Sequence, residues 1–199
     1  AVSLAYQETK VSVANWSLSV TPQSSAFKQE PAVSASDARR GRLSFGMRGE
    51  QPMAFLWDSK QGKLHLDLNR NEDLTDDTNG VFTSREKSLA GGRYQNFTDV
   101  RLSLPTEAGR YPLLLDLHLT AYDAVRATAS LRSFYSGKVT LQEREWQIGL
   151  VDKPSGQRGA LLDASLLLRP WEAQDKPFQA ESGTMDAFRF STNLFFQGR

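Results

Sequence analysis

The sequence predicts an all-β protein, either an antiparallel β-sandwich or two packed β-sheets, with little helix. Three observations lead to this prediction. Apolar residues recur with a period of two rather than 3.6, clusters of Gly, Pro, Asn and Asp separate the apolar runs, and helix signals are scarce. This spacing is typical of about ten to twelve short strands.

Alternation of apolar and polar residues marks five strand candidates, because successive side chains of a strand point to opposite faces of the sheet. Each candidate therefore has one face suited to burial. In chain order, the alternating apolar positions are Val11 and Val13 near Trp16; Leu43, Phe45 and Met47; Leu64, Leu66 and Leu68; Val100, Leu102 and Leu104; and Leu113, Leu115, Leu117 and Leu119.

Two β-hairpins are also predicted. The first joins residues 53–57 to residues 63–68 through a polar turn in which Gly62 can adopt a positive φ. The second joins residues 139–141 to residues 146–150 across a four-residue polar connection. Both hairpins pair segments that are close in sequence, so the predicted sheets are antiparallel.

The composition suggests how the chain is divided. Residues 1–36 are expected to form N-terminal strands followed by a linker, because residues 21–36 contain two prolines and many small residues. Residues 37–199 then form a β-rich domain. Its prolines at each end make residues 105–112 a possible internal boundary.

Composition also excludes several classes of function. The net charge is only +1, from 24 basic and 23 acidic residues, so we expect no nucleic-acid partner. The absence of Cys excludes disulfides, thiolate metal sites and Cys nucleophiles. No apolar run reaches the ~18 residues of a membrane span. A first residue other than Met fits a mature exported protein, so a secreted or periplasmic location is expected.

The strongest chemical signal is an acidic loop at residues 67–77, which reads DLNRNEDLTDD. Five of the 23 acidic residues fall within these eleven positions, with Arg70 the one basic residue among them. Oxygen-bearing side chains at alternate positions suit Ca²⁺, which takes six to eight oxygen ligands. The candidate ligands are Asp67, Asn69, Asn71 and Asp73, with the closing pair Asp76 and Asp77. Leu74 is expected to turn back into the core.

Glu72 departs from the calcium-loop pattern, because such loops usually carry Gly where the backbone turns sharply with φ > 0. A residue with a side chain costs about 1 kcal/mol there. Position twelve is Thr78 rather than Glu, which disfavours an EF-hand. The alternative to an ion site is a solvated acidic turn whose Asp and Asn side chains hydrogen-bond their own backbone.

Several segments together resemble a group of uncharacterised exported bacterial β-rich proteins. They are residues 64–77, 97–100, 135–141, 146–152 and 166–171. Members of this group carry a D-x-N-x-(N/D)-G-D-L-T-D-D loop and are sometimes fused to thioredoxin-like domains. The resemblance implies export and a Ca²⁺ cofactor, but no reaction. The ligands it implies are Asp67, Asn69, Asn71, Asp73 and Asp77.

No catalytic residue is assigned. The two histidines, His65 and His118, lie on the more polar faces of their strands, and the common hydrolase motifs are missing. We therefore expect a non-catalytic accessory or interaction module with a protein or glycan partner. Two alternatives stay open: a carbohydrate-binding module, with Trp171 after Pro170 as its candidate ligand contact, and a hydrolase of unknown substrate.

Overall fold

The computed structural model describes residues 3–45, 52–84, 94–106, 109–151 and 165–173. In these ranges the protein is all-β, with strands in two antiparallel sheets, as the alternation of apolar residues predicts. The helices in the described ranges are the short 3-10 turns η1 (Thr78–Gly80) and η3 (Trp171–Ala173). None of the described helices is long and apolar enough to span a membrane.

The large sheet has eight strands in the order β6-β5-β4-β3-β2-β9-β8-β7. Most neighbours in this order are also consecutive in sequence, as hairpins are; the exception is the pair of β2 with β9. The strands are β2 (Ala14–Pro22), β3 (Ala38–Ser44), β4 (Met53–Asp58), β5 (Lys63–Leu66), β6 (Val81–Thr83), β7 (Tyr94–Thr106), β8 (Gly109–Ala121) and β9 (Val125–Leu131).

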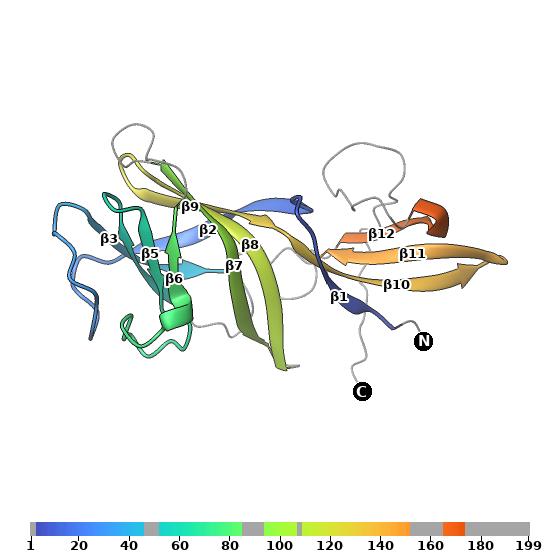
Figure 1. The fold of residues 1–199 in the computed structure, drawn as a ribbon, viewed down its shortest axis with the longest axis horizontal. Coiled ribbons are helices and arrows are strands. Elements are labelled where there is room, and N and C mark those ends of the chain that lie inside the picture. Colours follow the sequence, from blue (N-terminus) through green and yellow to red (C-terminus); the bar gives the residue numbers. More distant parts are fainter. Residues whose placement is uncertain (1–2, 46–51, 85–93, 107–108, 152–164, 174–199) are drawn as a thin grey trace.

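The small sheet has four strands in the order β1-β10-β11-β12. They are β1 (Ala5–Glu8), β10 (Ser133–Leu141), β11 (Arg144–Val151) and β12 (Ser165–Pro170). Figure 1 shows the two sheets side by side, with β9 of the large sheet continuing into β10 of the small one. One residue, Arg132, separates these two strands.

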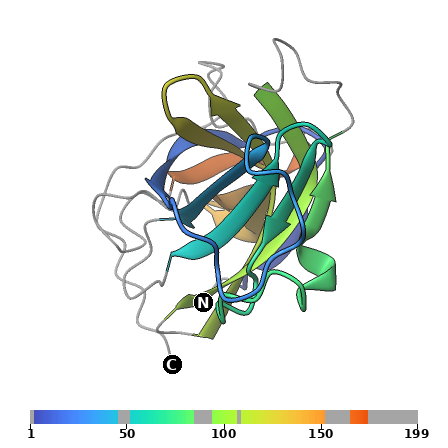
Figure 2. The ribbon, with the colours of Figure 1, turned by 90° about the vertical axis from the view of Figure 1, so that its left-hand side faces the viewer.

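The large sheet curls until its two ends approach each other, which gives a nearly closed barrel (Figure 2). The closure is visible in Gln95 of β7, whose side-chain amide donates to the backbone oxygen of Ser59 in the β4–β5 turn at 2.9 Å. Its carbonyl oxygen accepts the indole N–H of Trp57, which is fully buried. Curling buries one face of each strand around a common core.

That core explains the alternating leucines. Leu113, Leu115, Leu117 and Leu119 of β8 are all buried in the main hydrophobic cluster. Every residue of β4 is buried, because its other face covers a second, smaller cluster. This second cluster consists of Phe27, Ala38, Ala54, Leu56 and Leu74. Leu74 therefore turns back into the protein, as predicted.

Both predicted hairpins are present. β4 and β5 form the first, and Gly62 in its turn has φ 67°. β10 and β11 form the second, but its connection is shorter than predicted. Arg144 already pairs with Leu141, so the turn contains two residues, Gln142 and Glu143, rather than four.

The segments on either side of the predicted domain boundaries contribute strands to both sheets. Residues 1–36 supply β1 to the small sheet and β2 to the centre of the large one. The possible boundary at residues 105–112 covers the end of β7 and the start of β8, where Pro105 pairs with Arg110, and its residues 107–108 lie outside the described ranges.

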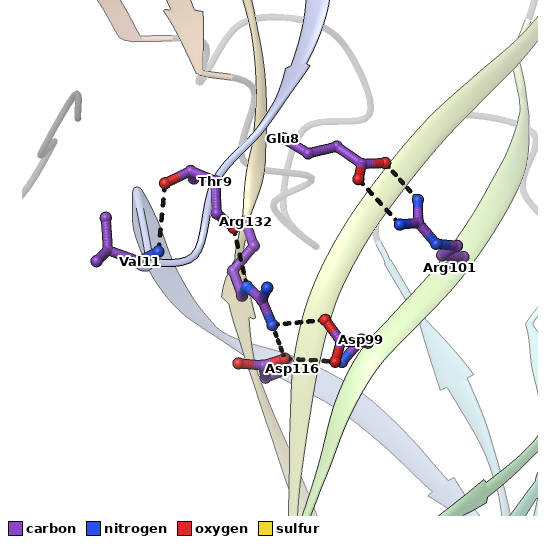
Figure 3. A network of polar contacts seen from close by, with 7 residues as sticks. All are labelled: Glu8, Thr9, Val11, Asp99, Arg101, Asp116 and Arg132. Atoms are coloured by element: carbon purple, nitrogen blue, oxygen red, sulfur yellow. Dashed lines mark hydrogen bonds and ion pairs between the residues drawn. The ribbon is translucent and has the colours of Figure 1, made fainter. Parts of the chain in front are cut away.

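A polar cluster joins the two sheets where β9 becomes β10 (Figure 3). The Arg132 guanidinium contacts Asp116 of β8 at 3.0 Å and Asp99 of β7 at 2.9 Å. Its Nε donates to the backbone oxygen of Thr9, between β1 and β2, at 3.0 Å. The Arg132 side chain thus connects the barrel to the segment between β1 and β2. Nearby, Arg101 forms an ion pair with Glu8.

Candidate functional site

The acidic loop at residues 67–77 leaves the end of β5 and returns to the barrel through η1. Gly80 at the end of η1 packs directly on the incoming strand. A Cβ atom built at Gly80 would lie 2.3 Å from the backbone oxygen of Leu66, so no other residue fits there without a shift of the backbone. The two ends of the loop are therefore held together.

Asp67 organises the first half of the loop from beneath. Its side chain is 1 % exposed, and its two carboxylate oxygens accept the backbone N–H groups of Asn71 at 3.1 Å and Glu72 at 3.0 Å. These bonds require a tight curl. Arg70 and Glu72 supply it with φ values of 65° and 67°, in the left-handed region. Glu72 thus adopts the conformation for which calcium loops use Gly.

The next side chains repeat one motif along the loop. The carbonyl oxygen of Asn69 accepts the N–H of Asn71 at 3.1 Å, and that of Asn71 accepts the N–H of Asp73 at 2.7 Å. Asp73 accepts the N–H of Thr75 at 2.8 Å. In these successive Asx turns, the side chains of residues 69, 71 and 73 each accept the backbone N–H of the residue two positions later.

Three side chains meet above the curl. The amide nitrogens of Asn69 and Asn71 both donate to the same oxygen of Asp76, at 3.1 and 2.8 Å. Of the closing acidic pair, the resemblance implies Asp77 as a ligand, whereas Asp76 is the residue that reaches these two amides.

Asp77 instead supports the backbone at the start of the loop, where it accepts the N–H of Leu68 at 2.9 Å. Burial raises the pKa of the Asp77 carboxyl above its usual range. The negative charges of Asp76 and Asp67 act in the same direction, while hydrogen bonds from the Leu68 and Asn69 backbone oppose it. A nearby cation would lower this pKa.

Groups outside the loop offset part of its charge. Arg42 forms an ion pair with Glu72 at 2.5 Å, which lowers the pKa of the Glu72 carboxyl. Lys28 donates to the backbone oxygen of Asn71 at 3.0 Å. The loop is also joined to the segment before β3, since Leu74 donates its N–H to the backbone oxygen of Gln29 at 3.0 Å.

The five residues implied as ligands are thus split between three places. Asn69 and Asn71 meet at Asp76, Asp67 and Asp77 accept backbone N–H groups, and Asp73 contacts Thr75. The donor types suit Ca²⁺, since all are carboxylates or carboxamides. Within the described ranges, no group of three or more His, Asp or Glu side chains is close enough together to hold a metal ion.

The two histidines occupy different surroundings. His118 of β8 stacks on Tyr94, and its Nε2 lies 3.2 Å from the hydroxyl of Ser130 on the neighbouring strand. Nδ1 of His118 lies 3.4 Å from the hydroxyl of Tyr94. His65 of β5 is partly buried, and burial followed by the charge of Lys63 lowers its pKa, against the effect of Asp58.

The four tryptophans, among them the candidate carbohydrate contact Trp171, occupy different surroundings. Trp57 is fully buried, and Trp16 packs against the main core. Trp171 is partly buried in η3, with the Lys138 ammonium 4.8 Å from the centre of its ring. Trp146 lines a groove with Leu141, Gln142, Arg144 and Leu168. Neither histidine lines this groove.

Comparison of the chain with protein-family models, with curated proteins and with solved structures finds no match.

Proposed function

We propose that this chain is a non-catalytic, exported β-domain whose 67–77 loop binds Ca²⁺ and which acts as an accessory or interaction module. The observation that carries the proposal is the junction of Asn69, Asn71 and Asp76 above a curl with left-handed residues. Three oxygen-bearing side chains from three positions of one loop meet there. The buried Asp67 holds the curl in place from below.

A small rearrangement turns this junction into a cation site. The oxygen and nitrogen of a carboxamide are almost equal in size, so a half-turn of the Asn69 and Asn71 amides exchanges donor for acceptor. Their oxygens then face the Asp76 carboxylate, an arrangement that a cation stabilises. The half-turns break two Asx hydrogen bonds and two bonds to Asp76, each contributing about 1 kcal/mol.

Because these hydrogen bonds must break before the ion binds, we expect the loop to bind Ca²⁺ weakly. Calcium sites of extracellular modules bind with Kd values of about 10⁻⁴–10⁻³ M. Such a site is filled outside the cell and not in the cytosol. Export and weak calcium binding therefore support each other in this proposal.

Calorimetric titration of the calcium-depleted protein with CaCl₂ tests the proposal. The unsubstituted protein should release or absorb heat with a stoichiometry of one. Asp76→Asn should abolish the heat, because it removes the one charged group at the junction. Asp123→Asn, in the exposed turn before β9, is the matched control and should leave binding unchanged. Equal binding by the two variants, or no heat at millimolar calcium, would contradict the proposal and favour a solvated acidic turn.

A further inference from the structure

The small sheet carries a groove at the turn end of the β10–β11 hairpin, away from the acidic loop. The groove has a volume of about 760 Å³ and is partly open to solvent. Its lining residues are Leu141, Gln142, Arg144, Trp146 and Leu168. We propose that this groove binds an acidic carbohydrate, with a sugar ring against Trp146 and a sugar carboxylate on Arg144.

Strand register places these side chains on one face of the sheet. Arg144, Trp146 and Ile148 are two residues apart along β11, so their side chains share one face of the sheet. Leu141 is directly opposite Arg144, and Leu168 is opposite Ile148, so both leucines lie on this face as well. The face thus combines an aromatic ring with two leucines. The indole nitrogen of Trp146 is buried, so the surface that Trp146 offers to the groove is ring carbon. Ring carbons stack on the C–H face of a sugar.

The two polar side chains that line the groove, Gln142 and Arg144, are exposed to solvent. Arg144 is exposed and makes no ion pair within the described ranges, in contrast to Arg40, Arg42, Arg101 and Arg132. Gln142 is also exposed, at the tip of the hairpin. A free guanidinium is suited to bidentate contact with a carboxylate, and a side-chain amide can serve hydroxyl groups.

The two acidic residues of the hairpin nearest the groove, Glu143 and Glu145, do not line it. Glu145 is on the opposite face of the sheet and pairs with Lys138 at 2.5 Å. Glu143 is at the apex of the turn and is not among the lining residues. The groove therefore presents one positive charge, which complements one carboxylate per binding unit.

The shape of the groove favours a sugar over a lipid. A fatty acid also has a carboxylate, but its tail requires an enclosed apolar channel. An open groove leaves one side of the ligand in water, which suits a molecule with one apolar face and many hydroxyl groups. Uronic acids have both features.

Titration calorimetry of the full chain in EDTA tests the proposal independently of calcium. The ligands are trisaccharides of galacturonate, glucuronate and mannuronate, and the methyl esters of the same sugars. We expect at least one acid to bind and its ester to bind about tenfold more weakly, because the ester loses a charge-assisted hydrogen bond.

Variants locate the site. Arg144→Gln should weaken binding of the acid about tenfold or more and leave the ester unaffected, while Arg144→Lys should be intermediate. Arg126→Gln, at an exposed position of β9 in the other sheet, should change nothing. Equal binding of acid and ester, no binding by any of the three acids, or tighter binding of decanoate in the same groove would each overturn the proposal.

Discussion

Glu72 holds a backbone conformation that side chains disfavour, and its neighbours explain why it does so. Its N–H is fixed by the buried Asp67, and its carboxylate pairs with Arg42 of β3. The ion pair compensates locally for the left-handed φ. The sequence shows that a non-Gly residue stands at the turn, but it cannot show the arginine opposite, which is thirty positions earlier.

Two substitutions at Glu72 separate the backbone from the ion pair. Both Glu72→Gly and Glu72→Ala lose the contact with Arg42, but only Gly relieves the left-handed strain. We expect the Gly variant to be more stable than the Ala variant by about 1 kcal/mol. Urea denaturation of the pair measures the difference, and equal stabilities would show that the loop does not hold this φ in solution.

Asp77 connects the loop to pH. Its raised pKa means that the folded protein disfavours the ionised form, so this group contributes stability that is present at low pH and lost as pH rises through the folded-state pKa. A bound calcium ion would oppose the rise in the Asp77 pKa, because the ion favours the ionised carboxylate. We expect added Ca²⁺ to lower the pKa of Asp77 in a carboxyl NMR titration. Asp77→Asn, which keeps an acceptor for the Leu68 N–H, should remove the titration. An Asp77 pKa unchanged by calcium would argue against an ion at this loop.

At the scale of elements, the β10–β11 hairpin shows what alternation can predict. The pairing of Val139 with Trp146 agrees with the period of two, whereas Leu141 pairs with the polar Arg144. The length of the turn does not follow from this period, because it depends on two residues accepting positive φ. Gln142 and Glu143 have φ values of 49° and 63°, although neither is Gly or Asn.

A glycine in this turn should stabilise the hairpin. Glu143→Gly places Gly at the second position of a two-residue turn with two left-handed residues, where it is preferred. We expect a gain of about 0.5–1 kcal/mol in the free energy of unfolding. Thermal unfolding measures it, with Thr140→Gly in the adjoining strand as the control that should destabilise. A loss of stability in Glu143→Gly would mean that the turn has another geometry.

For the whole molecule, the sequence predicts two sheets but not how they meet. The apolar pattern of residues 125–141 is compatible with one long strand, and nothing in it marks the change of sheet at Arg132. The contacts that define this junction come from Thr9, Asp99 and Asp116, which are distant from Arg132 in sequence. Asp99 reaches it from a bulge in β7, where its φ is 59°.

Arg132 and Arg101 form a matched pair for testing this junction. The Arg132 side chain is 14 % exposed and that of Arg101 is 64 % exposed. Arg132→Met leaves the partly buried Asp116 without its cation, and we expect it to lower the free energy of unfolding by about 2 kcal/mol. Arg101→Met removes a surface ion pair, for which we expect less than about 1 kcal/mol. Urea denaturation compares the two, and equal losses would show that Arg132 does not join the sheets.

The residues of the acidic loop could be selected from the sequence, whereas their pairing could not. Spacing identifies the oxygen donors at alternate positions and the return of Leu74 to the core. It does not distinguish Asp76 from Asp77, because the turn at η1 decides which carboxylate reaches the two amides. The groove beside Trp146 could not be predicted from the sequence either, because one of its lining residues, Leu168, comes from a different strand.

Thermal unfolding with and without calcium tests the central claim most directly. A ligand that binds only the folded protein contributes about 1.4 kcal/mol at tenfold its Kd. For a chain of this size, that corresponds to an increase in Tm of about 3–6 °C. We predict this increase for the unsubstituted protein in millimolar CaCl₂ relative to EDTA, and none for Asp76→Asn. Identical Tm values in calcium and in EDTA would contradict the claim.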